Sequence, residues 1–260
     1  MLFQIKSYLN FLYNSKNQHG VHSPFVYNLV TKCFYDTAKY PEYSTLKAYR
    51  NSLLANKNTI EVTYFGASSR VFKSTTRAIS QIAKTAGISS KRAELLFRIV
   101  NYFQPESILE IGTSLGLATS ALALGKKKTE IITVEECSNT LNQCQLQLQK
   151  FNIINVTAIH TEFSSYLSTQ NPKPKTQDLI YFGGNPSKKV TLEYFELLLP
   201  TITNDSVWIF DDIHRCKDME ASWKIIQNHP KVTITIDTFH WGIVFFRNEQ
   251  KKEHFVIRVG

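Results

Sequence analysis

A carboxylate followed directly by a glycine-rich turn lies near the middle of the chain. Residues 108–118 read Ile-Leu-Glu-Ile-Gly-Thr-Ser-Leu-Gly-Leu-Ala, which places Glu110 just before a Gly112-x-x-x-Gly116 turn. Glycine allows a sharp turn and the close approach of a ligand to the main chain. The start of the helix that follows offers N–H groups to a carboxylate or phosphate, and Glu110 can accept hydrogen bonds from a ligand amine. The turn favours a nucleotide-like ligand, with an ordinary strand-to-helix turn as the alternative.

A second carboxylate follows this turn at a spacing that nucleotide-binding proteins use. Glu135 comes 19 residues after Gly116, and an acidic residue about 20 positions after a glycine turn can bind both hydroxyls of a ribose. The alternative is a solvated carboxylate at a strand end. Ligands of doubly wound sheets bind at the carboxyl ends of the strands. The other candidate residues at such ends are Thr113, Ser114, His160, Glu162, Phe163, Gly183, Asn185, Asp211, Asp212 and His214.

The second part of the chain alternates apolar runs with helical patterns, as an α/β fold requires. The last apolar runs have no helix between them, so we expect antiparallel strands at one sheet edge. We predict a Rossmann-like, mostly parallel seven-stranded sheet with helices on both faces and an antiparallel edge. Strands are expected near 107–111, 130–134, 155–159, 178–182, 206–210, 232–238, 242–247 and 255–259, and helices near 116–124, 138–151, 187–198 and 216–228.

The first part of the chain is expected to be mostly helical and to cover the sheet domain. Ser23 followed by Pro24 is typical of a helix start, and Ser89 precedes a strongly amphipathic helix that ends before Pro105. We predict a helical cap over residues 1–104 and the α/β domain over 105–260. The small polar loop 65–70 is expected to lie over an acceptor pocket, where Arg70 would favour an anionic acceptor.

Composition excludes several classes of protein. The 260 residues are 43% hydrophobic, and no apolar run reaches the roughly 18 residues of a membrane span. The 30 Lys and Arg residues against 21 acidic ones give a net charge of +9, with the basic residues scattered. This charge either keeps the surface solvated or attracts an anionic substrate or RNA, and no RNA-binding motif accompanies it. Without a signal peptide or a Cys-x-x-Cys pair, we expect a cytoplasmic protein with reduced thiols, and a homodimer is left open.

Over residues 105–260 the sequence resembles the class I S-adenosylmethionine-dependent methyltransferases. The resemblance is carried by the turn from Ile108 to Gly116, by Glu135 and by the antiparallel ending. Within that superfamily it is most similar to the catechol-type small-molecule O-methyltransferases, because of the preceding helices and the Phe-Asp-Asp sequence that ends at Asp212. The segments 19–25 and 65–70 resemble a bacterial subgroup of unassigned substrate.

The resemblance implies a role for each matching residue. The cofactor would be S-adenosylmethionine, and the partner a small-molecule acceptor rather than a nucleic acid. Glu135 would bind the ribose and Glu110 would lie behind the turn. The methionine part would be held by Gly112, Thr113, Ser114 and Gly116, while Glu162 and Phe163 would lie near the adenine and Gly183 would complete the cofactor site.

The sequence departs from the catechol-type pattern after the fourth strand. That pattern has an aspartate there and a lysine soon after, which bind Mg²⁺ and act as base, whereas this chain has Gly183 and Pro186 at those positions. Asp211 and Asp212 remain as metal ligands, and Mg²⁺ usually takes more oxygen ligands than these supply. We therefore expect activity without a strict need for Mg²⁺. Asp211 and His214 are the catalytic candidates, since a histidine has a suitable pKa for a base, and Lys188 is an alternative base.

The sequence thus predicts an enzyme that moves a methyl group from S-adenosylmethionine to an oxygen or nitrogen of a small molecule. The alternative is a methyltransferase-fold protein without catalysis that binds the cofactor or a partner, which the missing aspartate favours. A third possibility, an NAD-dependent dehydrogenase, expects Gly-x-Gly-x-x-Gly, and the turn that begins at Gly112 does not supply it.

Overall fold

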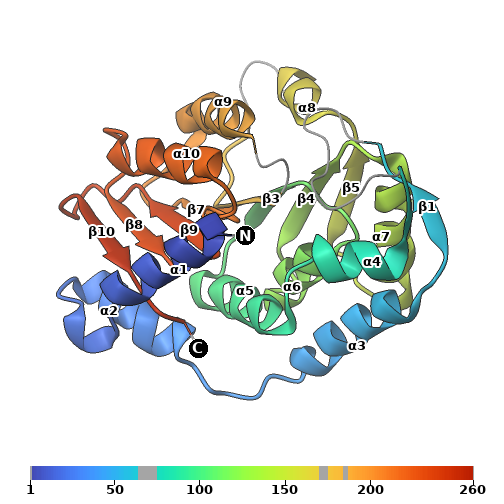
Figure 1. The fold of residues 1–260 in the computed structure, drawn as a ribbon, viewed down its shortest axis with the longest axis horizontal. Coiled ribbons are helices and arrows are strands. Elements are labelled where there is room, and N and C mark those ends of the chain that lie inside the picture. The colour runs from blue at the N-terminus through green and yellow to red at the C-terminus, as the bar shows by residue number, and fades with distance from the viewer. Residues whose placement is uncertain (1, 64–74, 170–174, 184–186, 260) are drawn as a thin grey trace. The chain divides into compact units, whose positions relative to one another are not determined.

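The computed structural model describes residues 2–63, 75–169, 175–183 and 187–259. The chain forms two compact units (Figure 1): unit 1 contains Met1–Tyr35 and Gln170–Gly260, and unit 2 contains Asp36–Thr169. This division does not coincide with the boundary predicted at 104/105, which stays a prediction. The loop 65–70 and Asn185 lie outside the described residues.

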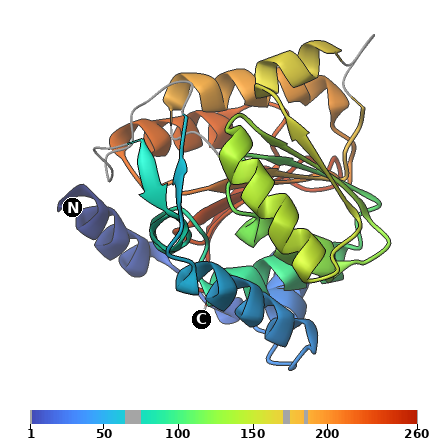
Figure 2. The ribbon, with the colours of Figure 1, turned by 90° about the vertical axis from the view of Figure 1, so that its right-hand side faces the viewer.

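Unit 2 contains a parallel sheet in the order β3-β4-β5. Its strands are separated in the chain by helices, so each connection is the crossover that parallel strands need. Figure 2 shows α7 lying across β4 and β5, with which it is in contact. These elements are β3 (Ser107–Ile111), α6 (Leu117–Gly125), β4 (Glu130–Glu135), α7 (Ser138–Lys150) and β5 (Val156–His160).

Helices precede this sheet in unit 2, as predicted. The Ser89 hydroxyl accepts the N–H of Arg92 and so begins α5. α5 packs closely on α6, since a Cβ on Gly125 would lie 2.6 Å from Val100 Cβ. The helices are α3 (Glu42–Ala55), α4 (Ile79–Thr85), α5 (Ser90–Phe103) and α8 (Phe163–Thr169), and β1 (Thr59–Glu61) pairs antiparallel with β2 (Thr76–Ala78). The analysis of the sequence did not identify β1, β2, α4 or α8, which are too short to show a period.

Unit 1 contains a mixed sheet in the order β10-β8-β9-β7-β6. β6 and β7 are parallel, and β9 is antiparallel to both β7 and β8. These strands are β6 (Leu179–Phe182), β7 (Val207–Asp211), β8 (Ile234–Asp237), β9 (Trp241–Phe245) and β10 (Glu253–Val256).

The last strand differs from the expectation, because β10 is parallel to its neighbour β8. β7 and β8 already pair with the two edges of β9, so the segment after β9 can pair only at the free edge of β8. This segment, β10, runs opposite to β9 and is therefore parallel to β8. With β10, the described strands β3 to β10 number eight, as many as the ranges expected from the sequence, although the sheet was predicted as seven-stranded.

Helices cover both faces of the sheet in unit 1. A Cβ on Gly242 would lie 2.5 Å from the Trp223 ring of α10, whereas Phe245, three positions later and on the other face, contacts Phe25 of α2 with ring centroids 5.0 Å apart. The Ser23 hydroxyl accepts the N–H of Val26 at 3.4 Å, so α2 begins as predicted. The helices are α1 (Leu2–Asn14), α2 (Pro24–Leu29), which continues as a π-helix (Val30–Phe34), α9 (Lys188–Leu198) and α10 (Lys217–Asn228).

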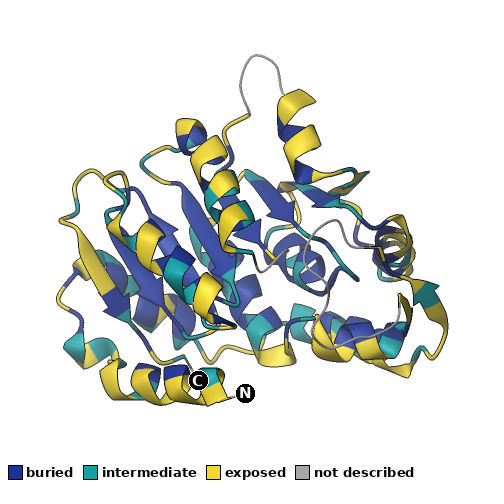
Figure 3. Cartoon of the chain, turned by 45° about the horizontal axis from the view of Figure 1, so that its top comes forward, coloured by how far each residue is buried: buried dark blue, intermediate teal, exposed yellow. Residues whose placement is uncertain are grey.

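The predicted fold class is confirmed as a Rossmann-like α/β fold, mostly parallel with antiparallel strands and preceded by helices. The strands are mostly buried, while α1 is exposed over much of its surface (Figure 3). Within the described residues, no helix combines the length and apolar character that crossing a membrane would need.

Candidate functional site

The glycine turn of unit 2 has the strained backbone of a ligand-binding loop. Gly112, Ser114 and Gly116 have φ angles of 89°, 50° and 77°, in the left-handed region that non-glycine residues seldom adopt. The Gly112 N–H donates to Val134 O of β4 at 2.9 Å. The turn is therefore fixed to the neighbouring strand where β3 ends.

Gly116 is closed in by two helices of the same unit. A Cβ at this position would lie 2.5 Å from both Cys144 Sγ of α7 and Tyr49 Oη of α3. The Tyr49 hydroxyl also donates to Leu115 O at 2.9 Å. The space that this glycine leaves is filled by protein, so packing explains why a glycine is needed at this position.

Glu135 is held at the end of β4 by two main-chain groups. Its Oε2 accepts the N–H of Ser114 at 2.7 Å, and its Oε1 accepts the N–H of Cys137 at 3.0 Å. Burial raises the pKa of Glu135, although these hydrogen bonds oppose the increase. Each carboxylate oxygen has a further lone pair, so the group can also accept ribose hydroxyls.

Glu110 lies fully buried at the end of β3. Its Oε2 accepts the hydroxyls of Thr119 at 2.5 Å and Thr133 at 2.6 Å, and Thr133 is in turn hydrogen-bonded to Thr113. Burial raises the pKa of Glu110 to about 7. Its Oε1 has no hydrogen-bond partner among the described residues. This network connects the end of β3, the glycine turn and the first turns of α6.

The predicted adenine contacts lie where β5 ends. Glu162 is exposed, and Phe163 is buried at the start of α8, where its ring stacks with that of Tyr166. Unit 2 thus contains the turn, the β4 carboxylate and this pair of residues, and their roles toward the methionine, ribose and adenine parts of S-adenosylmethionine stay predictions.

In unit 1, Asp211 and Asp212 follow β7. Asp211 Oδ2 accepts the Tyr181 hydroxyl at 2.9 Å, and Oδ1 accepts the N–H of Asp212 at 2.8 Å. Asp212 has a φ of 55° and forms an ion pair with Arg215 at 3.2 Å. Gly183, at the end of β6, is exposed.

These residues do not fit a Mg²⁺ site. The described residues contain no group of three or more His, Cys, Asp or Glu side chains placed to hold a metal. Mg²⁺ requires near-octahedral oxygen coordination, whereas this end of β7 offers two carboxylates, and one of them, Asp212, is paired with Arg215 at 3.2 Å. Gly183 supplies no side-chain ligand.

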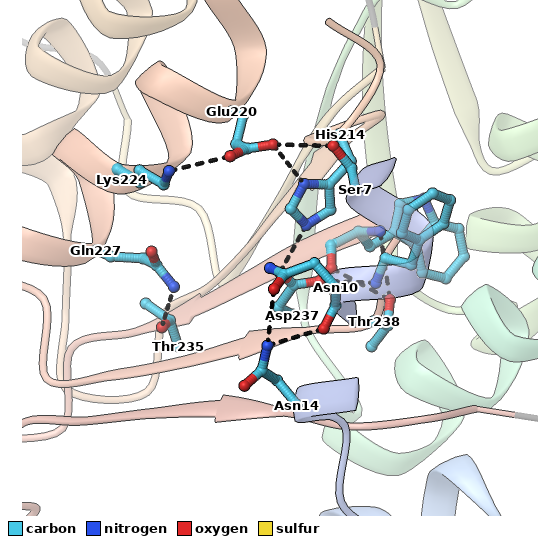
Figure 4. A network of polar contacts seen from close by, with 12 residues as sticks. Ser7, Asn10, Asn14, His214, Glu220, Lys224, Gln227, Thr235, Asp237 and Thr238 are labelled. Carbon is cyan, nitrogen blue, oxygen red and sulfur yellow. Dashed lines mark hydrogen bonds and ion pairs between the residues drawn. The ribbon is translucent and has the colours of Figure 1, made fainter. Parts of the chain in front are cut away.

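His214 lies between two carboxylates (Figure 4). Its Nε2 is 2.7 Å from Asp237 Oδ2, and its Nδ1 is 3.4 Å from Glu220 Oε2. Burial lowers the pKa of His214, but the hydrogen bonds and charges of Asp237 and Glu220 outweigh that effect and raise it. The general-base role stays a prediction, and this geometry argues against it because both ring nitrogens are engaged.

A cavity of about 460 Å³ lies beside these groups within unit 1, which is in the size range of small-molecule sites. It lies at the end of β7 and is bounded by α1 and by the turn between β8 and β9. Its lining includes Tyr8, Leu9, Asp212, His214, Arg215 and Phe239.

Comparison with known proteins agrees with this fold. Residues 109–213 match the family model of a methyltransferase domain. A Podospora anserina methyltransferase bound to S-adenosylhomocysteine has a TM-score of 0.60 and 13% identity, over 88% of this chain and 97% of that one. An O-methyltransferase from Bacillus cereus bound to S-adenosylhomocysteine has a TM-score of 0.55 and 17% identity, over 80% and 91%.

An O-methyltransferase from Streptomyces achromogenes, involved in tomaymycin synthesis and bound to S-adenosylmethionine, has a TM-score of 0.56 and 14% identity, over 84% and 95% of the two chains. At these identities the structures share the fold. The chain therefore carries a methyltransferase domain on a Rossmann-like fold. In structure it is similar to several O-methyltransferases that bind S-adenosylmethionine or S-adenosylhomocysteine.

The analysis of the sequence missed several residues that shape these sites. The hydroxyl of Thr119, in the first turns of α6, donates to Glu110. Because Thr119 follows the glycine turn closely in the sequence, its position could have suggested this contact. Tyr49, Glu220 and Asp237 come from distant elements, and no local pattern identifies them.

Proposed function

We propose that this protein transfers a methyl group from S-adenosylmethionine to an oxygen of a small-molecule acceptor. The observation that carries the proposal is the Glu135 carboxylate, held at the end of β4 by the N–H groups of Ser114 and Cys137. In this position it can accept both ribose hydroxyls in charge-assisted hydrogen bonds. The bound cofactor would supply an electrophilic methyl group on a positively charged sulfur.

The chain's own residues would position the reactants and remove a proton. The glycine turn and Glu135 would orient the cofactor, which converts a bimolecular reaction into an effectively unimolecular one. A carboxylate after β7 would take the acceptor's proton. The predicted catalytic carboxylate, Asp211, accepts the Tyr181 hydroxyl and the N–H of Asp212. Asp212, which follows it, lines the cavity of unit 1 and is paired with Arg215.

Calorimetric titration with S-adenosylhomocysteine tests the cofactor site. We expect binding in the low micromolar to submillimolar range, roughly −5 to −8 kcal/mol. Glu135→Gln should weaken it about 10- to 100-fold, since a hydrogen bond to a charged group contributes about 1.5–3 kcal/mol. Glu136→Gln is the matched control, because it changes the neighbouring carboxylate and leaves the Ser114 contact intact. Equal affinity in the two variants, or no heat from the wild-type protein, would refute this cofactor site.

Turnover separates an enzyme from a cofactor-binding protein without catalysis. Release of S-adenosylhomocysteine from S-adenosylmethionine should rise above background when a panel of hydroxylated small molecules is added. Binding without turnover on any acceptor would favour the non-catalytic alternative, which the glycine at position 183 supports.

A further inference from the structure

His214 connects two separate elements of unit 1 through its two ring nitrogens. The contact to Asp237, at the end of β8, is 2.7 Å long, and that to Glu220, on α10, is 3.4 Å long. An ionised carboxylate can only accept hydrogen bonds, so the ring must donate from both nitrogens to satisfy both partners. A ring in this state has no lone pair with which to accept a proton from a substrate.

Asp237 links His214 to the turn that follows β8, because its carboxylate contacts both. Its Oδ1 accepts the N–H of Phe239 at 2.7 Å, and Phe239 has a φ of 73°. A bulky residue seldom adopts this conformation, so the surroundings must hold it there. The Phe239 ring also stacks on the His214 ring, with centroids 5.4 Å apart and planes 16° apart. His214 therefore fixes this ring both directly and through Asp237.

Glu220 carries the connection to α1. Its Oε2, which faces His214, also accepts the Ser7 hydroxyl at 3.1 Å. Its Oε1 accepts from Lys224 at 3.0 Å in an exposed pair (Figure 4). Glu220 Oε2 thus contacts both Ser7 of α1 and His214, whereas Oε1 contacts only Lys224 among these residues.

α1 also meets the Phe239 ring through its own aromatic residues. The rings of Tyr8 and Phe239 are 4.8 Å apart in an edge-to-face arrangement, and those of Phe11 and Phe239 are 5.5 Å apart. Tyr8 and Phe239 both line the 460 Å³ cavity. The position of α1 and that of the Phe239 ring together set the shape of this cavity.

We propose that His214 is a positioning residue that holds α1 and the Phe239 ring in place as walls of the cavity by donating to Glu220 and Asp237 together. The positioning role itself does not depend on methyl transfer.

Amide hydrogen exchange tests the mechanical role. His214→Gln replaces two donors on opposite sides of a ring with one amide nitrogen, so exchange in α1 should accelerate at least tenfold while β7 and β9 stay protected. Ser7→Ala should accelerate α1 alone. Lys224→Gln is the matched control, because it removes the other contact of Glu220, and it should leave α1 within about twofold of the wild type.

Asp237→Asn provides an independent route if His214→Gln does not fold, and it should also accelerate exchange in α1. Unchanged exchange of α1 in folded His214→Gln or Asp237→Asn would overturn the proposal, as would an equal effect of Lys224→Gln. None of these measurements uses the cofactor. A failure of S-adenosylhomocysteine to bind would therefore defeat the proposed function and leave this inference standing.

Discussion

Glu135 accepts the main-chain N–H of Ser114 at 2.7 Å, so the carboxylate after β4 and the glycine turn after β3 are joined directly. Ser114 has a φ of 50°, and this hydrogen bond helps to hold it in that conformation. Ser114 and Glu135 are thus fixed relative to each other before any ligand binds. Such preorganisation lowers the entropy cost of ordering the protein when a ligand binds.

The stability of unit 1 should depend on the protonation of His214. Its folded pKa is raised above the ordinary value of 6.5 by Asp237 and Glu220, which outweigh burial. Its contribution to the free energy of unfolding is therefore fully present below pH 6.5 and is lost as pH rises through the folded pKa. Urea unfolding between pH 5.5 and 9 should show the wild type losing its advantage over His214→Gln as pH rises. A difference that stays constant with pH would contradict this.

Glu110 should make the free energy of unfolding depend on pH between about 4.5 and 7, below the range in which His214 acts. Burial raises its pKa from 4.5 to about 7, so the folded chain favours the neutral acid. Its contribution is fully present below pH 4.5 and is lost as pH rises to about 7. The loss is roughly 3 kcal/mol at 1.36 kcal/mol per pKa unit.

Glu110→Gln supplies the comparison for this second prediction. The neutral amide does not titrate, so the variant should gain stability relative to the wild type between pH 4.5 and 7, measured by urea unfolding without ligand. A parallel pH dependence of the two proteins would show that Glu110 is not responsible.

Replacing Gly116 by alanine should destabilise the fold. The new Cβ would lie 2.5 Å from Cys144 Sγ and Tyr49 Oη, at a φ of 77°. Overpacking and a left-handed alanine together cost about 2–4 kcal/mol. Gly183→Ala is the control, since Gly183 is exposed and is not in a left-handed conformation, and it should stay within about 0.5 kcal/mol of the wild type. Equal melting temperatures for the two variants would contradict this packing.

Methyl transfer, where it is detected, should persist after chelation of divalent ions. Asp211 and Asp212 are the carboxylates that the family's metal site retains, and Asp211 already accepts two hydrogen bonds. Adding Mg²⁺ to chelated enzyme should change the rate by less than about twofold, and calorimetry should show no tight Mg²⁺ binding. Complete loss of turnover on chelation, restored by Mg²⁺, would show that these two carboxylates suffice.

The elements of the fold followed from local patterns in the sequence. The alternation of apolar runs with amphipathic segments predicted β3 to β9 and the helices α6, α7, α9 and α10 between them, because side-chain burial repeats with the period of each element. The short helix α8 was not predicted. The glycine turn and Glu135 were also predicted, since their spacing is fixed by one strand–helix–strand unit. The direction of β10 was not, because it depends on which strand edges are already occupied.

The sequence by itself identified the residue types of the site, and the tertiary structure decided what several of them do. A histidine after β7 suggests a base, but Asp237 lies 23 residues further on and Glu220 lies on α10. Ser7, which shares Glu220, is 213 residues away from it. The sequence placed Glu110 before the turn and Glu135 after the next strand, and the structure shows one fully buried among threonines and the other held by main-chain N–H groups. Spacing along the chain gives a side chain's position on its own element. The protonation and bonding of that side chain are set by burial and by groups from distant elements, which only the packed structure brings together.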